Sequence, residues 1–284
     1  MSMYALLVEP FATLAFMRGA LVACMALALA SGVIGTLLVL RRMSLDGDVL
    51  GHAVMPGAAV GYLYAGPSPT WLSIGGLVSG LAVAALAGLI SRGRQRQEAG
   101  LVAFYLIALS LGVVLVAWRG SNVDVMRVLF GTVLAIDRPA LFQIAGAASI
   151  VIIGAAVLYR ALAVDAFDPV FLRAVGARAP YRALFQGLVV LTLVASFQAF
   201  GTLLAVGPLL LPAAAARCWP LGVVGLMALA IAFGLFASLG GLLLSYHANL
   251  PSGPAIVLTS ALPFGVSMLL APVRWHVRDL RRRK

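Results

Sequence analysis

Long stretches without a charged residue constrain this sequence more than any other feature. Asp, Glu, Lys and Arg are all absent from Gly19–Leu40, Val49–Ser91, Ala99–Trp118, Pro139–Tyr159, Ala183–Ala216 and Cys218–Val273. A helix that crosses a bilayer needs about 20 apolar residues, so each stretch can hold one span and three can hold two. Only 10% of the residues are charged, whereas a soluble domain carries about 25%. We therefore predict an all-α, polytopic membrane protein.

Basic residues at the ends of these stretches predict the orientation of the chain. They cluster at Arg41-Arg42, at 92–96, at 160–182 and at 274–284. The positive-inside rule places all four clusters in the cytoplasm, together with the C-terminus. The uncharged loop at 65–70, AGPSPT, is then outside, as is the N-terminus. The net charge of +11 is explained by membrane orientation, and we expect no nucleic-acid partner.

Successive loops alternate between the cytoplasm and the outside along the whole chain only if residues 183–216 cross the membrane twice, with a break near Gly201. We then expect nine spans in one transmembrane domain over 1–284, and only Arg18, Arg119, Arg127 and Arg138 of the basic residues lie outside. Loop 119–138 mixes apolar and charged residues and is predicted to lie as an amphipathic helix on the outer surface. The spans cover roughly 16–40, 44–64, 71–91, 100–118, 139–160, 183–199, 202–218, 220–246 and 251–273.

Two carboxylates and an imidazole stand in the otherwise apolar stretch MSLDGDVLGHAVMPG, residues 43–57. Ser44 or Asp46 is expected to cap the second span. Asp48 and His52 are four residues apart and share a helix face, so both can reach one ion. Such a pair suits Zn²⁺, or Mn²⁺ if more oxygen ligands join, and a second copy or another helix must complete the shell. The alternative is a hydrogen-bonded Asp–His pair packed between helices.

Pro56 and Gly57 follow this pair within the same predicted span. Proline has no N–H to donate and disturbs the preceding turn. We therefore expect this part of the helix to be loosened, with freed backbone carbonyls beside the Asp48–His52 face.

The cytoplasmic segment 164–182, VDAFDPVFLRAVGARAPYR, is too amphipathic for a simple connection. Asp165 or Asp168 can cap a short helix, with an apolar face that contains Phe171 and Leu172 and with an end at Gly176. Such a helix requires a partner on the cytoplasmic side. The alternative is a helix held on the membrane surface by its arginines.

Motifs for ATP hydrolysis and for catalysis are absent. No GxxxxGK[ST] phosphate loop occurs, and the only lysine is Lys284. HExxH and Ser/His/Asp spacings are also absent, so we do not expect an enzyme. Active transport by this chain would need a separate ATPase subunit.

Several motifs in order resemble the permease subunits of the metal-specific ABC-3 family, which are subunits of ABC importers for zinc, manganese and iron(II). The similarity extends over nearly the whole chain. The motifs that carry it are RRMSLDGDVLGHAVMPGAAVG (41–61), VLFGTVLAID (128–137), DPVFLRAVG (168–176), GTLLAVGPLLLPAAAA (201–216) and SYHANLPSGPAIVL (245–258). Family members often have an acidic residue where Val170 stands here.

The resemblance implies a fold like that of type II ABC importers and a homodimer with a central metal pathway. It also implies two cytoplasmic ATP-binding cassette subunits, an external metal-binding protein and no permanently bound cofactor. Asp48 and His52 match residues that line the pathway, and Gly201, Gly207 and Pro212 match a gating stretch. The residues that match the ATPase-coupling segment are Asp168, Phe171, Leu172, Arg173 and Gly176.

We therefore predict an ATP-driven importer permease in the bacterial cytoplasmic membrane. Zinc is the first choice of transported metal, with manganese or iron(II) as the alternative. A stand-alone metal channel or secondary transporter would explain Asp48 and His52 equally well but not segment 164–182. A membrane enzyme with His52 as ligand or base is a third possibility, weakened by the lack of a third clustered ligand.

Overall fold

The structure is a computed structural model, and every regular element in its described residues is a helix. It describes residues 8–66, 68–90, 133–167, 181–201, 204–282 and six positions between 103 and 114. The helices are α2 (Glu9–Thr13), α3 (Ala15–Leu40), α4 (Ser44–Ala65), α5 (Pro69–Ile90), η1 (Val133–Ala135), α8 (Arg138–Phe167), α10 (Tyr181–Phe200), α11 (Gly207–Arg217), α12 (Val223–Ala248) and α13 (Ser252–Arg282).

Six of the described helices are long and apolar enough to cross a membrane: α3, α5, α8, α10, α12 and α13. Helix α4 has 22 residues but is less apolar, because it carries Asp46, Asp48 and His52. The described positions between 103 and 114 are all helical and fall in the predicted fourth span. Together with the short helix α11 these elements agree with the predicted number of about nine helices.

The predicted break near Gly201 is present. Helix α10 ends at Phe200, Gly201 has a φ of 77°, and α11 begins only at Gly207. A positive φ is accessible to glycine without the steric cost that a Cβ atom adds. Helix α11 has 11 residues and a length of about 16 Å, so it is shorter than the predicted span 202–218 and does not cross a bilayer by itself.

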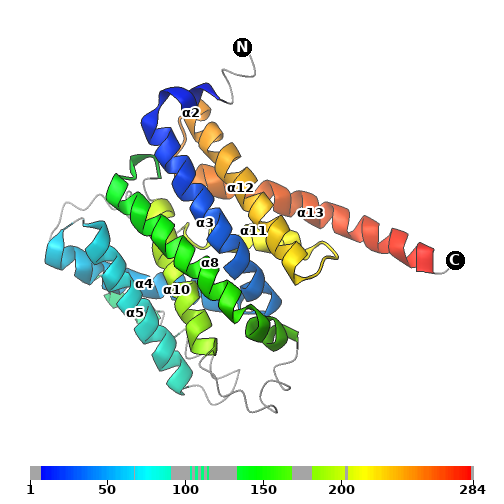
Figure 1. Ribbon diagram of the computed structural model, residues 1–284, viewed down its shortest axis with the longest axis horizontal. Helices are drawn as coiled ribbons and strands as arrows, with labels where there is room; N and C mark the ends of the chain where they lie inside the picture. The colour runs from blue at the N-terminus through cyan, green and yellow to red at the C-terminus, as the bar shows by residue number, and fades with distance from the viewer. Residues whose placement is uncertain are drawn as a thin grey trace.

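Other element bounds also differ from the prediction. Helix α8 continues through Phe167, seven residues beyond its predicted end, and α13 continues to Arg282 instead of 273. Figure 1 shows α13 extending away from the other helices toward the C-terminus. Most of loop 119–138 lies outside the described residues. The structure describes the end of this loop, residues 133–138, which contains the short helix η1. Val133 in η1 is fully buried, so this part of the loop is not the predicted surface helix.

Helix α3 occupies the centre of the bundle. Figure 1 shows α4 and α5 on one side of it and α12 and α13 on the other. Leu27, Ile34 and Leu37 of α3 are buried in two clusters that also contain residues of α8 and α10. Packing around this helix therefore fixes the positions of the elements that carry the predicted site.

Glycines allow α4 and α5 to approach closely. A Cβ atom added to Gly57 would overlap the carbonyl oxygen of Gly75, and one added to Gly61 would overlap that of Trp71. Small residues at such contacts let helix backbones meet, which is how helices associate where the hydrophobic effect does not drive them. This contact holds the α4 helix, with Asp48 and His52, against α5.

We predict that Gly57→Ala destabilises the protein by about 1–3 kcal/mol, because the new methyl group forces the two backbones apart. The measurement is the free energy of unfolding in detergent. Gly146→Ala in α8 is the matched control, since an added Cβ there has no neighbour within 4 Å. Equal stability of the two variants would contradict the close α4–α5 contact.

Candidate functional site

Asp48 and His52 lie one turn apart near the start of α4, as their spacing predicts. The distance from Asp48 Oδ1 to His52 Nε2 is 3.8 Å. The side chain of Asp48 is 55% exposed and that of His52 is 17% exposed. Among the described residues no group of three or more His, Cys, Asp or Glu side chains could hold a metal ion. Within that part of the chain, the pair therefore offers an incomplete ligand shell.

The exposed side chains of α4 lie at its two ends. Leu45 and Asp48 are exposed at its start, and Val60 and Tyr64 at its end, where the ring of Tyr64 lies 5.2 Å from that of Trp71 on α5. Residues 49–59 are buried or half-buried, and α4 packs mainly on α5 and α10. A carboxylate that faces lipid hydrocarbon costs several kcal/mol, so a face with Asp48 on it belongs against water or protein.

Asp46 does not cap α4, contrary to prediction. The residue at the N-cap is Met43, which makes no side-chain capping hydrogen bond, and Ser44 is already the first helical residue. Asp46 stands in the first turn, where a negative charge interacts favourably with the helix dipole. Asp46 is therefore distinguished from Asp48 by its place in the first turn of the helix, and not by a capping hydrogen bond.

Pro56 does not interrupt α4, which continues to Ala65. The hydroxyl of Ser79 on α5 donates a 2.6 Å hydrogen bond to the carbonyl oxygen of Ala53. Pro56 cannot donate to the His52 carbonyl four residues earlier. Helix α4 is therefore continuous across Pro56-Gly57 and is attached to α5 there by hydrogen bonding and glycine packing, and the loosening of this stretch stays a prediction.

The predicted gating stretch touches α4 at Val206. A Cβ atom added to Gly51, the residue before His52, would come within 2.9 Å of Val206, which directly precedes α11. Gly207 begins α11 and packs on Val257 of α13, and Pro212 is buried within α11. Helix α11 itself packs mainly on α3, α12 and α13.

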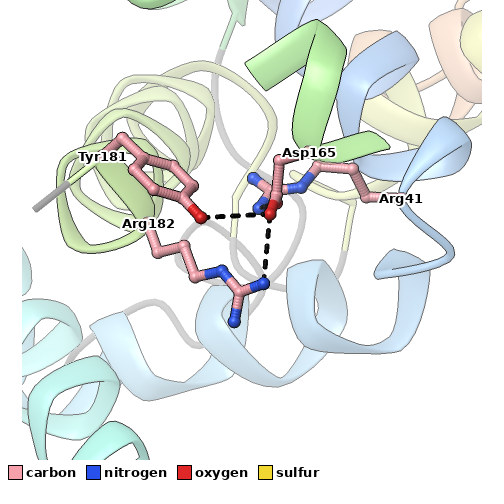
Figure 2. A network of polar contacts seen from close by, with 4 residues as sticks. All are labelled: Arg41, Asp165, Tyr181 and Arg182. Atoms are coloured by element: carbon pink, nitrogen blue, oxygen red, sulfur yellow. Dashed lines mark hydrogen bonds and ion pairs between the residues drawn. The ribbon is translucent and has the colours of Figure 1, made fainter. Parts of the chain in front are cut away.

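Asp165 forms a buried ionic cluster that sequence reasoning did not anticipate (Figure 2). Its carboxylate accepts hydrogen bonds from Arg41, from Arg182 at 3.0 Å and from the hydroxyl of Tyr181 at 3.2 Å. The side chain of Asp165 is 3% exposed and that of Arg41 is 6% exposed. Asp165 lies within α8, so the prediction that it caps a helix in segment 164–182 is wrong.

Arg41 is held on a second side by Phe185. Its guanidinium lies 4.7 Å from the centroid of the Phe185 ring, within the range of cation–π attraction. Removing one partner of a buried ion pair costs about 3–5 kcal/mol, because the other charge stays buried and unpaired. The Asp165 cluster (Arg41, Asp165, Tyr181 and Arg182) therefore fixes the ends of α3, α8 and α10 relative to one another.

A second polar cluster joins α5, α8 and α10 near the opposite ends of these helices. Gln198 donates to Ser73 and, at 3.2 Å, to the amide oxygen of Gln143. Gln143 in turn donates to Thr70 at 2.6 Å. The sequence patterns used above depend on charged residues and do not reveal this cluster. Two glutamines inside otherwise apolar stretches, Gln143 and Gln198, indicate it in the sequence.

The predicted ATPase-coupling residues Asp168, Phe171, Leu172, Arg173 and Gly176 lie outside the described residues. The described residues on either side of them, Asp165, Tyr181 and Arg182, are joined in the Asp165 cluster. The roles of these five residues stay predictions.

Comparison with known proteins identifies the family. Residues 13–271 match the ABC 3 transport family. This chain belongs to that family. The identification made from its motifs is confirmed, and the chain is a multi-pass permease of a metal importer.

Relatives of this ABC 3 permease match it over nearly their full length. The manganese import system permease protein ScaB of Streptococcus parasanguinis is 33% identical over 90% of this chain and 91% of ScaB. The manganese transport system membrane protein MntC of Listeria monocytogenes is 32% identical over 94% of this chain and 95% of MntC. The solved structure of PsaBC from Streptococcus pneumoniae in complex with Fab has a TM-score of 0.84 and 29% identity, and covers 97% of this chain and 99% of that chain.

We predict a coupling energy of about 1 kcal/mol between Gln143 and Gln198, which is typical of side-chain hydrogen bonds between membrane helices. The measurement is a double-mutant cycle on the free energy of unfolding in detergent with Gln143→Ala, Gln198→Ala and the double variant. Strictly additive effects of the two substitutions would show that the amides do not interact.

Proposed function

We propose that this chain is the permease subunit of an ATP-driven importer for manganese(II), with zinc and iron(II) as the competing cargoes. Zinc was the first choice from donor chemistry alone, but the relatives named above are manganese systems and favour the manganese alternative. A carboxylate and an imidazole accept any of the three ions, so the donors do not oppose manganese. The transported ion is cargo, and no resident cofactor is required.

The observation that carries the proposal is the Asp48–His52 pair near the start of α4, where the side chain of Asp48 is exposed. A divalent cation in hydrocarbon loses its hydration at a very large cost in free energy, so its passage needs protein ligands or water. Two ligands one turn apart hold the ion weakly and allow release. The exposed carboxylate of Asp48 is available to a passing ion, whereas that of Asp165 is enclosed by three donors.

A second copy of this chain fits the exposed face at the start of α4. Leu45 is 74% exposed there, less than one helix turn from Asp48, and an apolar side chain beside a carboxylate suits a protein interface around a wet pathway. A twofold axis beside this face would bring two Asp48–His52 pairs together, so four ligands could share one ion. We therefore propose a homodimer whose subunit interface forms the metal pathway.

The remaining partners are those that the resemblance to the ABC-3 permeases implies, placed according to the predicted orientation. Cytoplasmic ATP-binding cassette subunits dock on segment 164–182, and an extracytoplasmic metal-binding protein delivers the ion to the opposite side. We place the C-terminus in the cytoplasm, the N-terminus outside and the whole chain in one transmembrane domain of the bacterial cytoplasmic membrane. ATP hydrolysis belongs to the partner subunit.

Asp48→Ala and His52→Ala are each expected to reduce manganese uptake at least about tenfold, since each removes one of only two ligands on this face. The measurement is ⁵⁴Mn²⁺ uptake into proteoliposomes that contain the complete importer, with ⁶⁵Zn²⁺ measured in parallel. Asp46→Asn is the matched control, because it also removes a carboxylate from the first turns of α4 but leaves the Asp48–His52 pair unchanged. Near-normal uptake by both alanine variants would show that the pair contributes only to packing. Faster uptake of zinc than of manganese would restore zinc as the cargo.

We expect the double substitution Phe171→Asp and Leu172→Asp to abolish copurification of the ATPase, because it places two charges on the apolar face that is predicted to dock. Arg160→Gln, at an exposed position of α8, serves as the control. Metal uptake that persists after loss of the ATPase would favour a stand-alone channel or secondary transporter.

A further inference from the structure

The Asp165 cluster stands at both ends of the predicted coupling segment. Asp165 lies three residues before position 168, and Tyr181 and Arg182 directly follow position 180. Because both Tyr181 and Arg182 donate to Asp165, the described residues that flank this segment are tied together. A force applied between 168 and 180 therefore acts on the cluster from both sides.

Arg41 connects the same cluster to the helix that carries the metal ligands. It is the C-cap residue of α3, and α4 begins at Ser44 after a junction of only three residues. Arg42 in this junction has a φ of 58°, a left-handed conformation that is uncommon for a residue with a side chain. A junction this short and this sharply turned allows Arg41 little movement relative to α4.

The two arginines differ in their surroundings. The side chain of Arg41 is buried and stacks on Phe185, whereas that of Arg182 is 56% exposed. Asp165 thus has one enclosed partner, Arg41, and one solvated partner, Arg182. Figure 2 shows both beside its carboxylate. A carboxylate with only 3% of its side chain exposed has no water to replace a lost partner, so these groups move together.

We infer that Asp165 is a positioning residue that transmits movement of the coupling segment, through Arg41, to the start of α4 and hence to Asp48 and His52. This inference rests on the proposed function, since it requires an ATPase that acts on segment 168–180. It assigns to the Asp165 cluster a role in coupling transport to ATP hydrolysis, in addition to its contribution to stability.

The experiment measures Mn²⁺ imported per ATP hydrolysed, using proteoliposomes that contain the complete importer and equal amounts of assembled complex. Asp165→Asn is expected to lower this ratio by about tenfold, the scale of a typical coupling between sites. Arg182→Gln is expected to have a smaller effect, because Arg182 is half exposed. Arg160→Gln, on the same helix and in none of the ion pairs among the described residues, should leave the ratio unchanged.

A double variant separates coupling from folding. Arg41→Met combined with Asp165→Leu leaves no unpaired charge at the buried centre of the cluster, and such apolar replacements of buried ion pairs often preserve stability. We expect this variant to assemble with the ATPase and hydrolyse ATP while it imports little Mn²⁺. If it assembles and imports as much Mn²⁺ per ATP as the unmodified chain, the inference is overturned.

The same data distinguish failure of the proposed function. If the unmodified chain shows no ATP-dependent Mn²⁺ uptake, the proposed function fails regardless of the variants. If the unmodified chain is coupled and the apolar double variant is equally coupled, the importer stands and only the role of the Asp165 cluster fails.

Discussion

The cost of an unpaired polar group in a low-dielectric environment governs this structure. Hydrocarbon offers no hydrogen bonds, so the backbone of each span must satisfy itself within a helix. The same constraint explains the side chains. Ser79 donates to the Ala53 carbonyl, Gln198 to Gln143, and Arg41 and Arg182 to Asp165. Each of these bonds joins two helices, so satisfying polar groups also fixes how the bundle is assembled.

Asp48 departs from this pattern, which supports the role that we propose for it. Asp165 is an acidic residue in the same chain whose carboxylate is enclosed by donors from three residues. Asp48 instead has a side chain that is 55% exposed, beside a histidine nitrogen 3.8 Å away. An enclosed carboxylate is neutralised by fixed cations and serves the architecture. An open carboxylate on a helix face keeps its charge available to a mobile cation.

Sequence patterns predicted the spans well wherever charge and hydropathy change together. The bounds of α3 and α4 lie within one residue of the predicted 16–40 and 44–64, because Arg41 and Arg42 separate two apolar runs. The pattern indicates the end of α8 less well, because Arg160 predicts an end that the helix passes by seven residues. A carboxylate in a span is costly only when it has no partner, and Arg41, 124 residues away in sequence, supplies one. Such pairings depend on helix rotation and packing, which local patterns do not encode.

The arrangement of ligands also bears on how an importer can pass manganese when zinc binds most protein ligands more tightly. Affinity at a fixed nitrogen and oxygen site rises from Mn²⁺ to Zn²⁺, so a complete tetrahedral shell would retain zinc and exclude manganese from the pathway. In the pathway that we propose, one carboxylate and one imidazole on α4, with Asp48 half exposed, would bind any such ion loosely. Weak binding there would favour passage over retention. Selection between the two metals would then take place where the ion is first captured, outside the membrane, and not at Asp48 and His52.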